Sequence, residues 1–174
     1  YLAEKIEQFA GDGNRFGLAI HYSREPEPLE TGGAIYRALP LLGEAPFLLI
    51  NGDVWTDFPL PTLTEPILPD SALGRLLLVP NPTFHPRGDF SLSASRVGLA
   101  TDAERYTFAG VSLLRPALVA RYPERRSVFP LLEALRPAIE AGQLEGRVHH
   151  GQWSDVGTPE RLSQLEQQLQ STTG

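Results

Sequence analysis

The 174-residue chain is predicted to form a single α/β domain, in which a mixed, mostly parallel sheet is flanked by helices in a Rossmann-like arrangement. Residues 47–50 and 76–79 are unbroken apolar runs, which are typical of strands covered on both faces. Segments with a helical spacing of apolar residues alternate with the strands, and this alternation favours a parallel sheet. The content of 41% hydrophobic and 21% charged residues is an ordinary globular balance.

Apolar spacing and turn residues predict the elements of the first half of the chain. A helix is expected to end near Ala10, and a second helix is expected over 32–42, with Gly43 as its C-cap. Between them, alternating apolar residues predict a strand over 16–22. Four prolines within 59–69 predict an irregular segment with at most a short helix.

The second half of the chain is predicted to hold short strands and two helices. The segments that read as strands are 90–94, 97–100, 107–114 and 147–153. A helix is expected over 130–141, with Ser127 as a cap and Pro137 as the place where it kinks or divides. Thr158 and Pro159 are a good start for the last helix.

Composition excludes several classes of function. The formal net charge of −6 argues against a nucleic-acid backbone or an anionic membrane as the main partner. Without cysteine, the chain has no disulfide framework and no thiolate metal site. No apolar run approaches the ~20 residues of a membrane span, and the start lacks the layout of a signal peptide. A cytoplasmic protein is therefore expected.

Two absences concern the start of the chain. There is no methionine, and Lys5 is the only lysine, although lysine is a common phosphate ligand. We expect further residues to precede Tyr1, so that the single domain over 1–174 is incomplete at its N-terminus.

Two aspartates stand where strands are expected to end. Asp53 closes the triplet Asn51-Gly52-Asp53 after the 47–50 run, and Asp155 follows the 147–153 strand. Open α/β sheets bind ligands at the carboxyl ends of their strands, and Mg²⁺ bound to nucleotide phosphates typically takes one or two protein carboxylates. If the two strands are neighbours, one divalent metal fits between these aspartates. The alternative is that both residues only form turns.

At this point the chain resembles a known family, the sugar-1-phosphate nucleotidyltransferases. The resemblance rests on three motifs in the family's order: LETGGAI at 29–35, FLLINGD at 47–53 and WSDVGT at 153–158. Shorter stretches that support it are LPLLG at 39–43, VWTD at 54–57, RGDF at 87–90 and TFAG at 107–110. Within the family, the chain looks most like the uridylyltransferases that act on N-acetylmuramate 1-phosphate in cell-wall recycling.

The resemblance implies a reaction and a role for each matching residue. UTP and a sugar 1-phosphate would be the substrates, with Mg²⁺ as cofactor; oligomeric state stays open. Asp53 and Asp155 would be the catalytic residues and the metal ligands. The residues implied in nucleotide binding are Glu30, Thr31, Gly32, Gly33 and Asn51. Those implied in binding the sugar phosphate are Asp89 and Gly110.

Plainer interpretations stand beside these roles. Gly32 and Gly33 can simply start a helix, and Asn51 and Asp89 can simply close turns. The family's glycine-rich loop, with its arginine and following lysine, has no counterpart here, as expected if that part precedes Tyr1.

Other functions compatible with the sequence remain open. A mannose-1-phosphate guanylyltransferase would share the architecture, and a non-catalytic relative would bind nucleotide without turnover. A nucleotide-sugar glycosyltransferase usually places two aspartates one residue apart, whereas Asp57 is the next one after Asp53. For the lactyl carboxylate of an N-acetylmuramate substrate, the candidate cations are Arg87, His85, His149 and His150.

Overall fold

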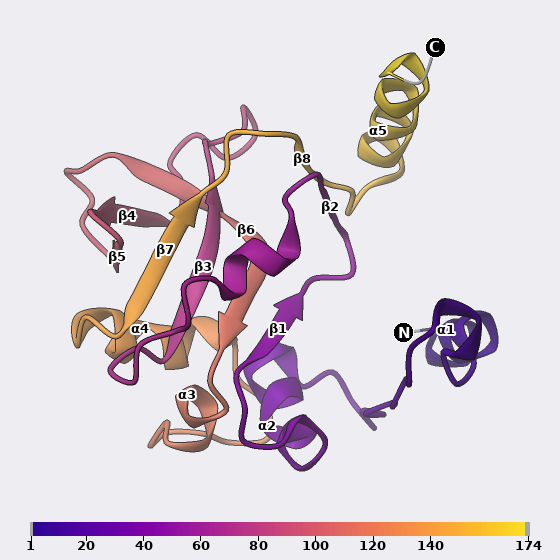
Figure 1. The fold of residues 1–174 in the computed structure, drawn as a ribbon, viewed down its shortest axis with the longest axis horizontal. Coiled ribbons are helices and arrows are strands. Elements are labelled where there is room, and N and C mark those ends of the chain that lie inside the picture. Colours follow the sequence, from indigo (N-terminus) through magenta and orange to yellow (C-terminus); the bar gives the residue numbers. More distant parts are fainter. Residues whose placement is uncertain (1, 173–174) are drawn as a thin grey trace.

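The computed structural model describes residues 2–172, which form a mixed α/β fold (Figure 1). Its larger sheet has six strands in the order β1-β6-β3-β7-β5-β4, and a separate two-stranded sheet pairs β2 with β8. The strands are β1 (Phe47–Ile50), β2 (Val54–Thr56), β3 (Gly74–Val79), β4 (Phe90–Ser93), β5 (Arg96–Gly98), β6 (Arg105–Leu114), β7 (Leu144–Val148) and β8 (Trp153–Asp155). The helices are α1 (Ala3–Ala10), α2 (Glu30–Leu42), α3 (Ala117–Ala120), α4 (Leu131–Glu140) and α5 (Pro159–Thr172), with short 3-10 turns η1 (Asn14–Phe16) and η2 (Leu60–Thr64).

Most strand pairs run antiparallel, so the predicted mostly parallel sheet is wrong. Among the described strands, only β3 and β7 pair in parallel, whereas β6 runs antiparallel to β1, β3 and β4. The cause is physical. An unbroken apolar run is only typical of a strand covered on both faces, and it carries no information on the direction of the neighbouring strands. β6 is buried through residues 109–114 and lies between β1 and β3.

Strand β3 is the centre of the packing because every one of its side chains is buried. Successive side chains point to opposite faces of a strand. Leu76 and Leu78 therefore belong to the core that includes Phe129 and α4, whereas Leu77 belongs to a second core with Leu63 of η2. The sheet thus separates two apolar layers, one under the helices and one under the 58–73 segment.

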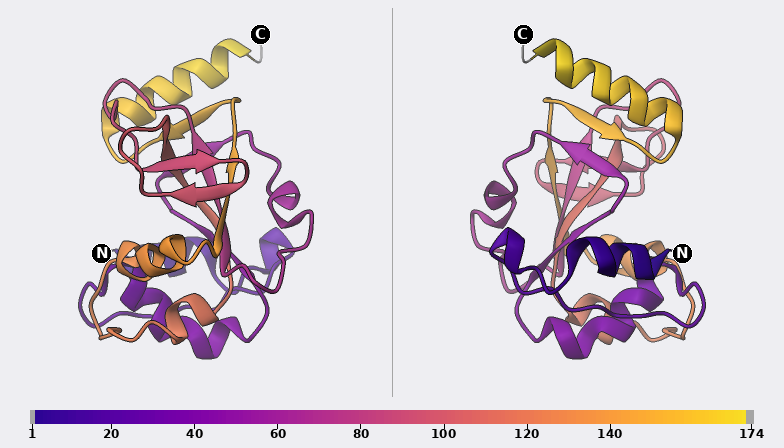
Figure 2. Two further views of the ribbon diagram at one scale, coloured as in Figure 1. Left: turned by 90° about the vertical axis from the view of Figure 1, so that its left-hand side faces the viewer. Right: turned by 90° about the vertical axis from the view of Figure 1, so that its right-hand side faces the viewer.

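The helices are unevenly distributed around the sheet. Helices α2, α3 and α4 gather at one end of it, and α5 extends from the opposite end beside β8, as Figures 1 and 2 both show. The two-stranded β2–β8 pairing lies near α5. Among the described helices, none is long and apolar enough to cross a membrane.

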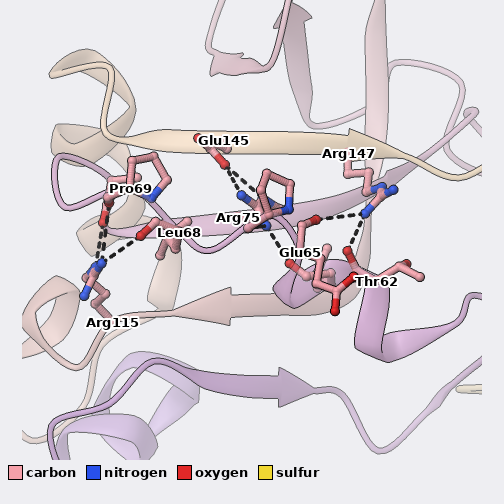
Figure 3. Close-up of polar contacts among 11 residues, drawn as sticks. Thr62, Glu65, Leu68, Pro69, Arg75, Arg115, Glu145 and Arg147 are labelled. Carbon is pink, nitrogen blue, oxygen red and sulfur yellow. Dashed lines mark hydrogen bonds and ion pairs between the residues drawn. The ribbon is translucent and has the colours of Figure 1, made fainter.

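Three arginines fasten the 58–73 segment to the larger sheet (Figure 3). Arg75 on β3 is 5% exposed and donates to the carbonyls of Leu63 (2.8 Å) and Pro66 (2.9 Å) as well as to Glu145 (2.8 and 2.6 Å). Arg115 donates to the carbonyls of Leu68 and Ala72, both at 3.0 Å. Arg147 donates to the carbonyls of Thr62 and Glu65. A loop rich in proline has few backbone N–H groups, so side-chain donors satisfy its carbonyls instead.

The predicted strands near 90–94, 97–100 and 107–114 and the two predicted helices of the second half are confirmed with adjusted bounds, but two predictions in the first half are wrong. Residues 16–22 form no strand, because alternation alone does not provide a partner, and Leu18 is 63% exposed. Strand β1 is not covered on both faces, since Leu48 and Ile50 are 37% and 47% exposed.

Later in the chain, the segment 147–153 splits between β7 and β8, and helix α4 continues through Pro137 without dividing. Pro130 takes the N-cap position of α4, and no side chain caps it, so Ser127 is not the cap.

Candidate active site

The pairing of β2 with β8 brings the two aspartates together. Asp53 lies in the turn between β1 and β2, and Asp155 is the last residue of β8. The strands are antiparallel with Val54 opposite Asp155, and the N–H of Val156 donates to the Asp53 carbonyl at 2.8 Å. We call this two-stranded unit the β2–β8 ribbon. It makes neighbours of two strand ends that are about 100 residues apart in the chain.

The carboxylates of Asp53 and Asp155 converge on Gly157. A Cβ atom placed on this glycine would lie 3.0 Å from Asp155 Oδ1 and 3.5 Å from Asp53 Oδ2. The same point would lie 3.5 Å from Nη2 of Arg161. The N–H of Gly157 also donates to Asp155 Oδ1 at 2.9 Å, which fixes that carboxylate. Two acidic groups and one cation therefore surround the space that a side chain at position 157 would fill.

Arg161 is a site residue that the sequence prediction missed. Its Nη1 lies 2.9 Å from Asp155 Oδ2, and its guanidinium lies 5.1 Å from the ring centre of Phe84. It stands in the first turn of α5, where its N–H donates to the Thr158 hydroxyl at 3.3 Å. The signal available in the sequence was its spacing from Asp155, but that spacing is informative only once the direction of α5 relative to β8 is known.

The two aspartates fit the protein's share of a hard divalent cation site. Both offer carboxylate oxygens, which such ions prefer, and Asp53 is exposed while Asp155 is half-buried. Within residues 2–172, no group of three or more histidine, aspartate or glutamate side chains is arranged to hold a metal. A cation at this place would thus depend on one or two protein carboxylates and take its other ligands from substrate and water, the arrangement that suits Mg²⁺.

Two adjoining cavities meet beside these aspartates. The first, of about 320 Å³, contains Asp53, Asp155 and Arg161, and we call it the carboxylate cavity. The second, of about 580 Å³, is walled by β4, α4 and the start of α2, and we call it the large cavity. Asn51 and Phe108 line both. A ligand with its phosphate in the first can therefore extend into the second.

Asp89 and Gly110 line different parts of this cleft. Asp89 lines the large cavity and accepts hydrogen bonds from the Phe108 N–H (2.8 Å) and from Nε2 of His85 (3.0 Å). Gly110 lines the carboxylate cavity and has a φ of 73°, a conformation that favours glycine. Its carbonyl accepts from the Asn51 N–H at 2.8 Å, which holds the strand end in place.

The residues at the start of α2 separate into two groups. Thr31 lines the large cavity, and Glu30 is exposed with a φ of 60°. Gly32 and Gly33 are buried and line neither cavity. A Cβ atom on Gly32 would come within 2.5 Å of the Phe129 ring, and one on Gly33 within 2.2 Å of the Ser127 carbonyl. Close packing against the 127–129 segment accounts for glycine at both positions.

A contact between His149 and Asp57 supports the β2–β8 ribbon. Nε2 of His149 lies 2.6 Å from Oδ1 of Asp57, and the His149 ring packs edge-on against Phe58. The pKa of Asp57 lies below its usual value, first because the backbone of Gln152 hydrogen-bonds to the carboxylate and then because His149 does. Two of the basic residues considered for substrate binding, His85 and His149, are thus already paired with aspartates.

Comparison with known proteins gives named relatives, although no family model matches the chain. An N-acetylmuramate alpha-1-phosphate uridylyltransferase of Neisseria meningitidis serogroup B is 41% identical over 171 residues, which cover 95% of this chain and 74% of that protein. A protein of the same name from Caulobacter vibrioides is 28% identical, with 97% and 74% covered. The crystal structure of HddC from Yersinia pseudotuberculosis complexed with GMP-PN superposes with a TM-score of 0.77 at 21% identity, over 97% of this chain and 75% of that one.

Proposed function

The chain belongs to the sugar-1-phosphate nucleotidyltransferases, and from that premise we propose that it transfers the uridylyl group of UTP to N-acetylmuramate 1-phosphate and releases pyrophosphate. The choice of base and sugar rests on the Neisseria and Caulobacter relatives, whose names specify both. The observation that carries the proposal is the convergence of Asp53 and Asp155 on Gly157, next to a cavity large enough for a sugar.

The reaction is an in-line displacement at phosphorus. A phosphate oxygen of the sugar 1-phosphate attacks the α-phosphorus of UTP, and the bond to the oxygen that bridges the α- and β-phosphates breaks as pyrophosphate leaves. Such transfers need little covalent chemistry from the protein, so positioning and charge stabilisation supply most of the catalysis. No protein-bound intermediate is required.

Different residues of the cleft would bind the metal, orient its ligands and contact the substrates. Asp53 and Asp155 would hold Mg²⁺, which when bound neutralises charge on the phosphate oxygens. Arg161, 2.9 Å from Asp155, keeps that carboxylate oriented and adds positive charge next to the phosphates. Asn51 lines both cavities and would hydrogen-bond to substrate at their junction.

The remaining residues orient the two substrates. Thr31 and Glu30, at the start of α2, would contact the nucleotide where it borders the sugar, since Thr31 lines the large cavity. Asp89 and Gly110 would contact the sugar phosphate from the two sides of the junction. Gly32 and Gly33 would act indirectly, by allowing the close packing that positions the start of α2.

The test is a pyrophosphate-release assay with UTP and Mg²⁺. Asp53→Asn and Asp155→Asn should each lose most of the activity while the protein stays folded, because the amide keeps the shape and removes the charge. Asp70→Asn is the matched control, since Asp70 is a fully exposed carboxylate whose contact, at 3.5 Å, is with Arg115. Near-normal turnover by either site variant contradicts the two-aspartate site.

Base and sugar are tested separately. We expect UTP to be preferred when each of the four nucleoside triphosphates is offered with N-acetylmuramate 1-phosphate. A preference for GTP with mannose 1-phosphate would instead identify a guanylyltransferase of the same family. Tight UTP binding without any pyrophosphate release would indicate a non-catalytic relative.

A further inference from the structure

We propose that Arg136 determines specificity for an acidic sugar, by binding the lactyl carboxylate of N-acetylmuramate 1-phosphate in the large cavity. The inference rests on the proposed function and goes beyond it, because it names the residue that distinguishes this sugar from a neutral one. It follows from the position of Arg136, from the state of the other charged groups around the cavity and from the chemistry of the guanidinium.

Arg136 lies on α4, which forms one wall of the large cavity. It follows Leu132 and Leu135 on the stretch of α4 that lines the cavity, while Asn51 marks the junction with the carboxylate cavity. A sugar 1-phosphate with its phosphate beside Asp53 would therefore extend its ring toward α4. The substituents of the sugar ring would then come within reach of α4. Among the ring substituents of N-acetylmuramate 1-phosphate other than the phosphate, the lactyl group is the one that carries a charge.

The other charged side chains that line the large cavity are already engaged. The Asp89 carboxylate accepts from Phe108 and His85. Nη2 of Arg105 donates to the carbonyls of Gly88 (3.2 Å) and Asp89 (2.6 Å), which ties this arginine to the residues just before β4. Nε of Arg105 has no hydrogen-bond partner among the described residues, but it is buried, so the exposed guanidinium of Arg136 is the more accessible partner for a substrate carboxylate.

Arg136 differs because it is exposed and has no partner. Throughout residues 2–172, no hydrogen bond or ion pair involves its side chain. The nearest acid along α4 toward its start, Glu133, is bound by Arg126 at 2.7 and 2.9 Å. Within residues 2–172, no acidic side chain therefore competes with a substrate carboxylate for Arg136.

A guanidinium is the side chain best suited to this task. Its planar fork pairs with a carboxylate through two parallel hydrogen bonds, and it stays charged at any physiological pH. The surroundings make the cation necessary as well as suitable. Asp53, Asp89 and Asp155 all lie in the same cleft, and the chain carries a net charge of −6, so an acidic sugar needs local compensation.

The basic residues that the sequence suggested for this role are placed less well. Arg87 does not line the large cavity itself but a hollow that adjoins it, since Gly88, Thr101 and Arg105 line both. His85 and His149 are paired with aspartates. His150 is exposed and lines neither cavity.

The experiment compares two sugar phosphates that differ by the lactyl group. Arg136→Gln should lower kcat/KM for N-acetylmuramate 1-phosphate by about 10–100-fold, mainly through KM, because a charge-assisted hydrogen-bonded pair is lost. Activity with N-acetylglucosamine 1-phosphate, which lacks the lactyl group, should stay within about twofold of wild type, since uniform binding of the rest of the sugar is untouched. Arg136→Lys should recover part of the loss.

Arg121→Gln is the matched control, because Arg121 is an exposed arginine at the end of α3 that lines neither cavity of the cleft. Arg121→Gln should leave kcat/KM unchanged for both sugar phosphates. Equal losses of the Arg136→Gln variant on both sugars, or no loss on either, would overturn the inference while leaving the proposed function intact. A wild-type protein that turns over other sugar 1-phosphates but not N-acetylmuramate 1-phosphate would overturn both.

Discussion

Gly157 is the position at which the candidate metal site is most sensitive to a small change. It is exposed, and its φ does not require glycine, so alanine is compatible with the backbone. The added methyl group would nevertheless occupy the point on which Asp53, Asp155 and Arg161 converge. With alanine here, the protein should therefore stay folded but bind the metal more weakly.

We predict that Gly157→Ala raises the Mg²⁺ concentration needed for half-maximal activity by about tenfold, in the range seen when groups around a metal are disturbed. A magnesium titration at saturating UTP measures this, with the melting temperature as the check on folding. Gly52→Ala is the comparison, because a Cβ at Gly52 meets nothing within 4 Å. If both variants shift the titration equally, crowding at position 157 is not the cause.

The β2–β8 ribbon is short, so contacts outside its backbone ladder matter to it. Asp57 follows β2 and meets His149, and the hydroxyl of Thr56 donates to the Gln152 carbonyl at 3.0 Å. These contacts connect the end of β2 and the residue that follows it to the loop before β8. Whatever loosens them should loosen the spacing of the two aspartates.

The depressed pKa of Asp57 gives this support a defined pH dependence. A carboxyl whose pKa is lower in the folded state stabilises the fold above its unfolded pKa, and that stabilisation is lost as pH falls through the folded pKa. Asp57→Asn should therefore lower the melting temperature at pH 7, and the difference from wild type should shrink below about pH 4. Thermal melts between pH 2.5 and 7 test this; a constant difference would mean that the charge of Asp57 does not matter.

The arginines that fasten the 58–73 segment should differ strongly in importance. Arg75→Leu removes a buried cation from Glu145 and leaves the carbonyls of Leu63 and Pro66 without their donor. We expect the free energy of unfolding to fall by about 2–4 kcal/mol, measured by urea denaturation.

Arg147→Leu is the matched control for Arg75→Leu. Arg147 also donates to loop carbonyls, but it is exposed, so water can replace it. Its loss should cost about 1 kcal/mol or less. Equal effects of the two variants would show that burial does not set the strength of these attachments.

The cleft joins opposite ends of the molecule, which makes ligand binding visible in global stability. Its carboxylate cavity belongs to the ribbon and α5, and its large cavity belongs to α2 and α4. A ligand that binds only the folded state stabilises it by mass action, so UTP with Mg²⁺ at about 100 times its dissociation constant should raise the melting temperature by about 5–10 °C. Chelation of Mg²⁺ with EDTA should remove most of the shift, as should Asp53→Asn. A shift that survives both would mean that nucleotide binds without the metal site.

The sequence contained more about the chemistry of the site than about its three-dimensional context. The closeness of Asp53 and Asp155 was predictable because polar residues at strand ends and the surrounding motifs point the same way. The positions of Arg161 and Arg136 beside the cleft were not, because they depend on how α5 and α4 are oriented relative to it. Periodicity within a helix cannot supply that orientation.

The same limit explains the errors about the sheet. Apolar runs located β1, β3 and β6, but the direction of β6 is decided by pairings with residues far away in the chain. The alternation in 16–22 is as regular as that of a true strand, yet no described segment pairs with it. A segment forms a strand only when another segment pairs with it, and its own sequence does not reveal whether such a partner exists.

The register of the ribbon also has a consequence for how the protein is made. Val54 pairs with Asp155, so a contact of very high sequence separation completes the carboxylate pair. Contacts of that kind form late in folding, because a long loop must close first. On a ribosome that adds about 5–20 residues per second, Asp53 emerges several seconds before Asp155. The nascent chain therefore cannot assemble this pair of carboxylates until Asp155 has been synthesised and has left the ribosome.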